Sequence, residues 1–114
     1  MMKSMWIVAL SAALLPMTAR ADADKKTQRT WKAKCASCHG ADGKGHTDQG
    51  EKMAIADYTD ATWQKSKTDS DIKKAIIDGV HREKAGKKQE MDGYKGKLSE
   101  EEIDKLVAYV RSLK

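Results

Sequence analysis

Two cysteines and a histidine lie close together in the segment Cys35-Ala36-Ser37-Cys38-His39. On a helix, side chains three and four positions apart share a face, so both thiols and the imidazole can reach one ligand. Thiols at this spacing can add across the two vinyl groups of a haem, and the adjacent imidazole can bind its iron from the proximal side. The C-x-x-C-H pattern therefore predicts one covalently attached haem c, with Cys35 and Cys38 as attachment points and His39 as an iron ligand.

Three other interpretations of this segment are weaker. A thioredoxin-type redox pair is expected beside a βαβ pattern, and the sequence shows none. A zinc site would need a further ligand, such as His46 or His81, at a spacing that fits no common zinc motif. A disulfide between Cys35 and Cys38 would close a very short loop and constrain the chain little.

The first residues have the features of a signal peptide. Lys3 supplies a positive charge, the run from Trp6 to Leu15 is almost wholly apolar, and Ala19-Arg20-Ala21 fits a cleavage site. The apolar run is short for a membrane span, so an uncleaved anchor is the weaker alternative. We therefore expect export to the periplasm, removal of residues 1–21, and one mature domain over residues 22–114.

Charge and composition narrow the function classes further. The formal charge of +5 falls to +3 when Lys3 and Arg20 are removed with the leader, which contains no acidic residue. Lysines are interspersed with Asp and Glu, and an exported protein rarely meets nucleic acid, so no nucleic-acid partner is expected. The small domain contains no phenylalanine. A buried haem would complete the core, so folding and cofactor attachment are expected to be linked.

The first predicted helix covers residues 25–37 and ends at the cysteine motif. Gly40 is the expected helix stop, and the glycine-rich residues 41–50 are expected to form a polar loop. The second ring nitrogen of a metal-binding histidine usually donates to an acceptor. A backbone carbonyl of this loop is therefore the predicted partner of His39.

The middle of the chain predicts shorter helices. Helical turns are expected over residues 51–56 and 60–64, with Asp60 as the cap of the second. The next helix is expected to be capped by Asp69 or Ser70 and to end at Gly79, with an apolar stripe of Ile72, Ala75, Ile76 and Ile77.

The last helix has the clearest signals. Ser99 and Glu102 form a capping box, and apolar residues then recur at helical spacing, namely Ile103, Leu106, Val107, Val110 and Leu113. Before this helix, residues 80–97 are expected to form a long polar loop that contains Met91. Because no strand pattern is apparent, the predicted fold class is all-α.

These features make the chain from Asp22 onward similar to the small bacterial class I cytochromes c. The similarity depends most on Cys35-Ala36-Ser37-Cys38-His39-Gly40 and on the C-terminal helix Leu106-Val107-Ala108-Tyr109-Val110-Arg111-Ser112-Leu113. It implies a cytochrome c-like fold in which three main helices pack around one haem, with the first and last crossing near its edge. It also implies His39 and a methionine as axial ligands and a periplasmic electron-shuttling role. Trp31 and Tyr109 match aromatic positions of the family.

The sequence departs from the family pattern at two positions. Thr27 stands where the family often has a glycine that lets the first and last helices approach each other. Asp92 follows Met91, where the family commonly has proline, so the ligand loop is expected to be less stiff.

Met91 is the predicted distal iron ligand, because a soft thioether stabilises reduced iron and the residue lies in a loop free to cross the haem face. Met53 is the other candidate methionine, although core packing explains it as well. His46, His81 and an open coordination site are further alternatives. Metal ligation is thus predicted for His39 and Met91.

Tyr58 and Trp63 are predicted haem contacts, since each combines an apolar body with a donor that suits a propionate; ordinary core packing is the alternative. Several lysines flank Met91 and would steer an acidic redox partner if they surround the haem edge, namely Lys84, Lys87, Lys88, Lys95 and Lys97. A solvated charged surface without a partner is the simpler interpretation.

Together these features predict a periplasmic one-electron carrier, not an enzyme, that acts as a monomer between redox partner proteins and can associate with a membrane complex. The main alternative is a haem enzyme, such as a weak peroxidase, or a gas-binding protein whose distal ligand is displaceable. A haem-free interaction module is the third possibility.

Overall fold

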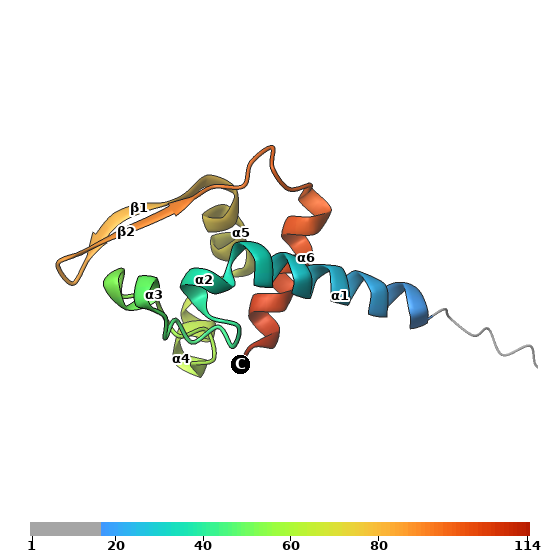
Figure 1. Cartoon of the computed structure of the whole chain (residues 1–114), viewed down its shortest axis with the longest axis horizontal. Coiled ribbons are helices and arrows are strands. Elements are labelled where there is room, and N and C mark those ends of the chain that lie inside the picture. The colour runs from blue at the N-terminus through green and yellow to red at the C-terminus, as the bar shows by residue number, and fades with distance from the viewer. Residues whose placement is uncertain (1–16) are drawn as a thin grey trace, which may run out of the picture.

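The structure is a computed structural model that describes residues 17–114, with residues 17–24 described by backbone only. The predicted signal peptide, residues 1–21, therefore lies largely outside the described residues and stays a prediction. Within the described part of the chain, no helix is long and apolar enough to cross a membrane. The elements in order are α1 (Met17–Lys34), α2 (Ala36–His39), α3 (Asp48–Lys52), α4 (Ala61–Ser66), α5 (Asp69–Asp78), β1 (Gly79–Lys84), β2 (Lys87–Asp92) and α6 (Glu100–Ser112) (Figure 1).

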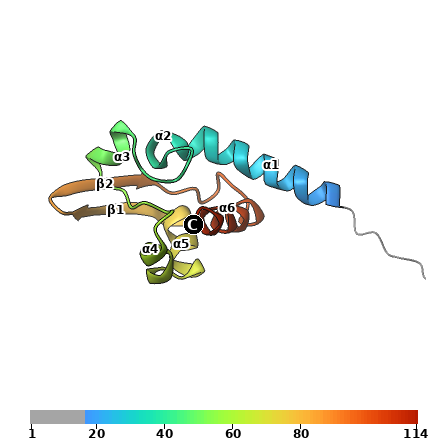
Figure 2. The ribbon, with the colours of Figure 1, turned by 90° about the horizontal axis from the view of Figure 1, so that it is seen from below.

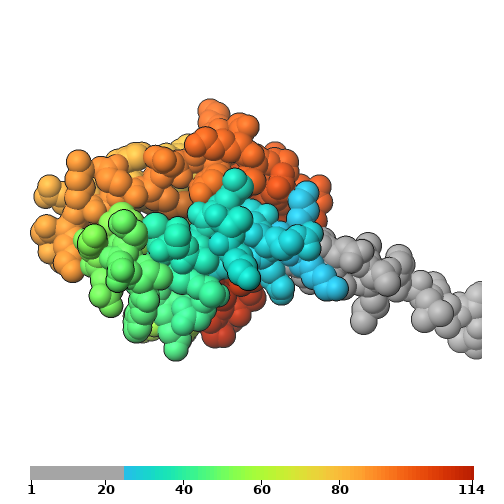
Figure 3. Space-filling model, in the orientation of Figure 1, coloured from blue at the N-terminus to red at the C-terminus, as the bar shows by residue number. Residues whose placement is uncertain are grey.

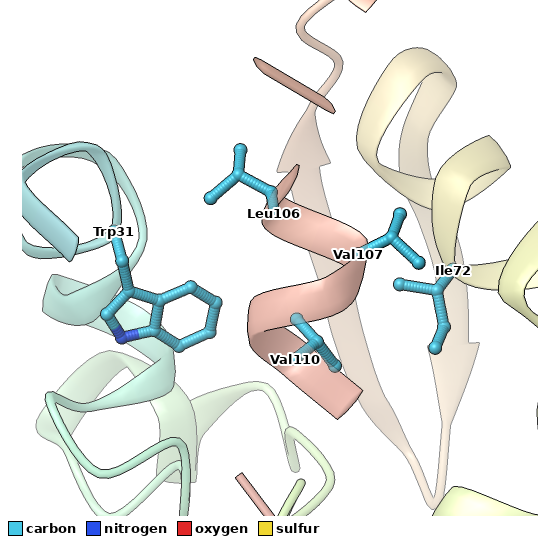
Figure 4. Packing of buried hydrophobic residues seen from close by; sticks show 5 residues of the cluster. All are labelled: Trp31, Ile72, Leu106, Val107 and Val110. Carbon is cyan, nitrogen blue, oxygen red and sulfur yellow. The ribbon is translucent and has the colours of Figure 1, made fainter. Parts of the chain in front are cut away.

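Helix α6 lies between α1 and α5 and supplies most of the core. Its apolar stripe follows the predicted helical spacing, and Leu106, Val107 and Val110 are all buried. Trp31 of α1 packs from one side and Ile72 of α5 from the other (Figure 4). The Trp31 and Tyr109 rings lie 5.1 Å apart between centroids, so α1 and α6 meet closely although Thr27 replaces the family's glycine.

Side-chain caps set the starts of the later helices. Ser99 and Glu102 form the predicted capping box at α6, and Asp60 caps α4 as predicted. Helix α5 is capped one residue earlier than expected, because Thr68 forms a capping box with Asp71. The predicted cap at Asp69 or Ser70 is thus wrong.

The all-α fold class is wrong as well. Residues 79–92, most of the predicted long loop, form an antiparallel hairpin of β1 and β2. Six helices accompany it in the described residues, so the architecture is mainly helical with an added two-stranded sheet.

The hairpin forms because its two strands are joined by a turn that suits it. Ala85 and Gly86 have φ angles of 52° and 74°, which is the left-handed conformation that a tight two-residue turn requires. Polar partners face each other across the strands, as in the pairs His81↔Glu90 and Arg82↔Gln89. The hairpin was not predicted because most residues of its strands are charged or polar. The strands therefore show no alternation between apolar and polar positions.

The hairpin extends from α5 alongside the α2–α3 segment (Figure 2). At its base, a Cβ atom on Gly79 would lie 2.3 Å from the Met91 carbonyl oxygen, and one on Gly93 would lie 2.4 Å from that of Ile77. Both positions therefore require glycine, and they bring the end of α5 against the end of β2. The return loop is held by Tyr94, whose hydroxyl donates to the Lys34 carbonyl at 3.1 Å.

Candidate functional site

The cysteine motif and the hairpin face one cavity of about 630 Å³. We call residues 31–58 the motif side and residues 79–94 the hairpin side. The motif side contributes Cys35, Cys38 and His39, and the hairpin side contributes Met91. A volume of this size is typical of sites for organic cofactors and ligands. The sequence-predicted site residues are thus brought together around one space.

Cys35 and Cys38 come from the junction of α1 and α2. The backbone N–H of His39 donates to the Cys35 carbonyl at 2.9 Å, so a turn of helix places the two thiols on the same face. Both cysteines are free and half-buried at the cavity wall. Burial raises the pKa of the Cys35 thiol to about 11, so this thiol is protonated at neutral pH.

His39 has the properties of an imidazole available to a metal. Burial lowers its pKa to about 4, so the ring is neutral at neutral pH. Its Nδ1 atom is buried and has no hydrogen-bond partner among the described residues, and the predicted loop carbonyl does not accept from it. The ring stacks on Tyr58 with centroids 5.0 Å apart. A buried polar atom without a partner is costly, and a ligand that bound this nitrogen would remove that cost.

Backbone contacts fix the end of the motif. The carbonyl of His39 accepts from the Gly45 N–H at 2.8 Å, and that of Gly40 accepts from the Trp31 indole N–H at 3.0 Å. The Cys38 carbonyl accepts from the Thr47 hydroxyl at 2.6 Å. Carbonyls at a helix end otherwise lack partners, so these bonds hold α2 in place.

The loop can make these bonds because Gly50 carries no side chain. A Cβ atom there would lie 2.3 Å from the Gly45 carbonyl oxygen and 2.6 Å from that of Cys38. Thr47 also caps α3 by accepting from the Gly50 N–H at 2.8 Å. The short α3 helix is therefore packed directly against the backbone of the motif.

Tyr58 and Trp63, the two residues predicted to contact a haem, both line the cavity. Their ring centroids are 4.2 Å apart, so together with His39 they form a continuous aromatic wall. Burial raises the pKa of the Tyr58 phenol to about 12, which keeps it neutral. Both residues also pack against the hydrophobic core, so core packing and a place at the cavity wall are compatible.

The hairpin has two chemically distinct faces. Successive side chains of a strand point to opposite sides, and the register places Val80–Met91, Arg82–Gln89 and Lys84–Lys87 on the inner face. Met91 is half-buried and lies in the apolar pair nearest the hairpin base. On the outer face, His81 Nδ1 lies 2.5 Å from Glu90 Oε2 and both side chains are exposed.

Gln89 fastens the hairpin to the motif side. It is only 7% exposed, and its amide nitrogen donates to the carbonyls of Met53 at 2.8 Å and Ala54 at 3.2 Å. Lys87 adds a bond from its ammonium group to the Glu51 carbonyl at 2.9 Å. Figure 3 shows the segment around α3 (green) lying against the hairpin (orange).

Met53, the alternative methionine, also lines the cavity. Its sulfur accepts a hydrogen bond from the Glu90 backbone N–H at 3.5 Å, so part of its lone-pair capacity is engaged by the hairpin. His46 and His81 are exposed, and neither lines the cavity. In the described part of the chain, no three His, Cys, Asp or Glu side chains are arranged to hold a metal ion on their own.

Sequence reasoning missed the residues that position the site. Thr47, Gly50 and Gln89 act through contacts with segments distant in sequence, which no local pattern reveals. The Ala85-Gly86 turn was detectable, since a glycine in a two-residue gap between segments of pairable charges indicates a hairpin.

The site fits a haem. Two free thiols on one helical face, a neutral buried imidazole with an unpartnered nitrogen, and a thioether on the opposite wall surround an aromatic-lined space of adequate volume. The donor set also matches iron of a haem, for which histidine and methionine are common axial ligands.

Comparison with known proteins gives a consistent result. The cytochrome c family model matches residues 25–114. The solved structure of the KustC0563 c-type cytochrome is similar to this chain at 33% identity and a TM-score of 0.66, covering 77% of this chain and 96% of that one. A tyrosine-to-phenylalanine mutant of the same cytochrome matches at 33% identity and a TM-score of 0.64, covering 77% and 98%.

Proposed function

The chain belongs to the cytochrome c family, and from that premise we propose that it is a periplasmic monohaem electron carrier that is not an enzyme. Haem c, which the family binds covalently, supplies the one-electron ferric/ferrous couple. The observation that carries the proposal is the meeting of Cys35, Cys38, His39 and Met91 around one cavity.

On the motif side, Cys35 and Cys38 would form the two thioether bonds and His39 would bind the iron. The neutral imidazole supports this role, because only the unprotonated ring nitrogen can donate a lone pair to a metal. The hydrogen bonds from Thr47, Gly45 and Trp31 to the motif backbone would hold this ligand in place before and after electron transfer.

On the hairpin side, Met91 would occupy the sixth coordination position. Its place in the inner Val80–Met91 pair supports this assignment, and the bond from Glu90 to the Met53 sulfur disfavours Met53. If His39 and Met91 both bound the iron, no position on the metal would be left for a substrate. The change of oxidation state would then need little rearrangement of the protein, which suits a carrier.

The partners of such a carrier would be redox proteins with acidic docking surfaces. Lys84, Lys87 and Lys88 lie next to the hairpin turn, and Lys84 lines the cavity. Opposite charge across an interface speeds encounter more than it tightens binding. We expect association to weaken steeply with salt concentration.

Expression with the haem-attachment machinery tests the proposal. Mass spectrometry of the mature protein should show one added tetrapyrrole, and the absorption spectra should show low-spin iron with thioether ligation. Met91→Ala should lose that ligation and Met53→Ala should retain it. A ferrous protein that binds carbon monoxide readily would instead favour the gas-binding or peroxidase alternative, and bare thiols would refute the proposal.

A further inference from the structure

One charged side chain on the inner face of the hairpin is oriented in a way that the proposed axial ligation does not explain. Arg82 lies opposite Gln89 in the strand register and lines the cavity. Its Nε atom donates to the Gln89 side-chain oxygen at 2.7 Å. Because Gln89 is buried and held by two backbone carbonyls, it provides a fixed attachment for the guanidinium group.

Arg82 is exposed, and the remaining donors of its guanidinium group are open to a ligand. Its terminal nitrogens make no hydrogen bond or ion pair within the described residues. A guanidinium group presents a planar fork that matches a carboxylate in two parallel hydrogen bonds. A preoriented fork at a cavity wall is therefore suited to a carboxylate that enters with the ligand.

The position of Arg82 along the strands agrees with such a contact. The Arg82–Gln89 pair lies two residues from Val80–Met91, which corresponds to about 7 Å along a strand. That separation would let Met91 and Arg82 contact different parts of one bound ligand. The guanidinium also lies within electrostatic reach of Tyr58, whose phenol is buried at the cavity wall.

The other charges at the cavity are less suited to this role. Glu90 is paired with His81 and Lys88, and Asp71 caps α5. Three lysines also line the cavity, but their ammonium groups make no hydrogen bond among the described residues that would fix their direction, namely Lys34, Lys67 and Lys84. Arg82 is thus a cation with a defined orientation.

We propose that Arg82 binds a propionate carboxylate of the haem through its guanidinium fork, with Gln89 holding that fork in position. This inference rests on the proposed function and adds a residue that links the hairpin to the cofactor's carboxylate edge. Arg82 would then fix the cofactor to the hairpin at a point separate from the Met91 sulfur. It would also favour the reduced state, because its positive charge would then lie near the iron.

Three haem-loaded variants test the assignment: Arg82→Gln, Arg82→Lys and Lys88→Gln. Lys88→Gln is the matched control, since it removes one positive charge from the outer face of the same hairpin. At a fixed solution potential, Arg82→Gln should lower the ratio of reduced to oxidised protein roughly two- to fivefold. Arg82→Lys should give a smaller decrease, and Lys88→Gln should leave the ratio close to wild type.

A second readout detects the contact itself. In the diamagnetic ferrous protein, with propionate carboxyl carbons labelled by ¹³C, Arg82→Gln should move the resonance of one propionate and leave the other unchanged. Two results would overturn the assignment in a protein that keeps its haem mass and low-spin spectrum. One is an equal change in the ratio of reduced to oxidised protein for Arg82→Gln and Lys88→Gln. The other is a propionate carboxyl resonance that does not move in Arg82→Gln. A protein without tetrapyrrole mass would overturn the proposed function, and this inference with it.

Discussion

Three consecutive carbonyls of the cysteine motif are each held by a hydrogen bond, whereas the hairpin that faces the motif is fastened to it mainly through the side chain of one residue, Gln89. On the motif side, the carbonyls of Cys38, His39 and Gly40 each accept a bond from a nearby segment. On the hairpin side, the buried amide of Gln89 is the main link to the rest of the molecule, and the outer ion pairs are exposed. We therefore expect His39, on the more firmly held motif side, to stay bound to the iron. Met91, on the less firmly held hairpin, is the ligand that we expect to adjust.

The largest difference in stability between the two sides is expected when one glycine on each side is replaced by alanine. Gly50→Ala would drive a Cβ atom into two backbone carbonyl oxygens and should cost about 3 kcal/mol of stability. Gly86→Ala in the hairpin turn meets no atom within 4 Å, so only its left-handed backbone opposes it, at about 1 kcal/mol. Urea denaturation of the haem-loaded proteins measures both. Equal losses of stability in the two variants would show that the motif side is no more rigid than the hairpin.

Removing the buried amide tests how far the hairpin depends on one residue. Gln89→Ala leaves the Met53 and Ala54 carbonyls without their donor and should cost about 2 kcal/mol. We expect the thioether absorption signature to weaken and carbon monoxide to bind faster, because Met91 is less firmly held. His39 ligation should persist. Unchanged carbon monoxide kinetics would show that the hairpin has other sufficient attachments.

A smaller change on the motif side sharpens the comparison. Thr47→Val keeps the shape but removes the hydroxyl that donates to the Cys38 carbonyl and caps α3. The expected cost is about 1 kcal/mol, without loss of thioether ligation on the hairpin side. Thermal denaturation combined with the absorption spectrum separates the two effects. Loss of Met91 ligation in this variant would mean that the two sides are coupled.

The smallest effect is expected at the exposed His81–Glu90 pair. The hydrogen bond from His81 lowers the pKa of the Glu90 carboxyl, so Glu90 stabilises the folded state above its ordinary pKa and loses this effect as the pH falls through the lowered value. ¹³C NMR titration should show a depressed Glu90 pKa in wild type and a rise toward the ordinary value in His81→Gln. Stability at neutral pH should change little, because exposed ion pairs contribute weakly.

The sequence predicted what local patterns encode. The C-x-x-C-H spacing, the stripe of α6 and the Ser99 cap each need only neighbouring residues, and all three lie where predicted. The hairpin was missed because its strands are paired through charges such as His81 and Glu90 and show no apolar alternation. Gln89 was missed for another reason, since its partners lie 35 and 36 residues away in the sequence.

The glycines at the hairpin base have an evolutionary consequence. Gly79 and Gly93 lie at the base of the strands beside Met91, while the Ala85-Gly86 turn lies at the opposite end, where a Cβ atom on Gly86 would meet no atom within 4 Å. Residues at this tip could therefore be exchanged, lengthened or recharged without disturbing Met91, the proposed iron ligand. For the proposed carrier, affinity for new partner proteins could in this way diversify independently of the haem site, and the tip is the natural place to graft a recognition peptide.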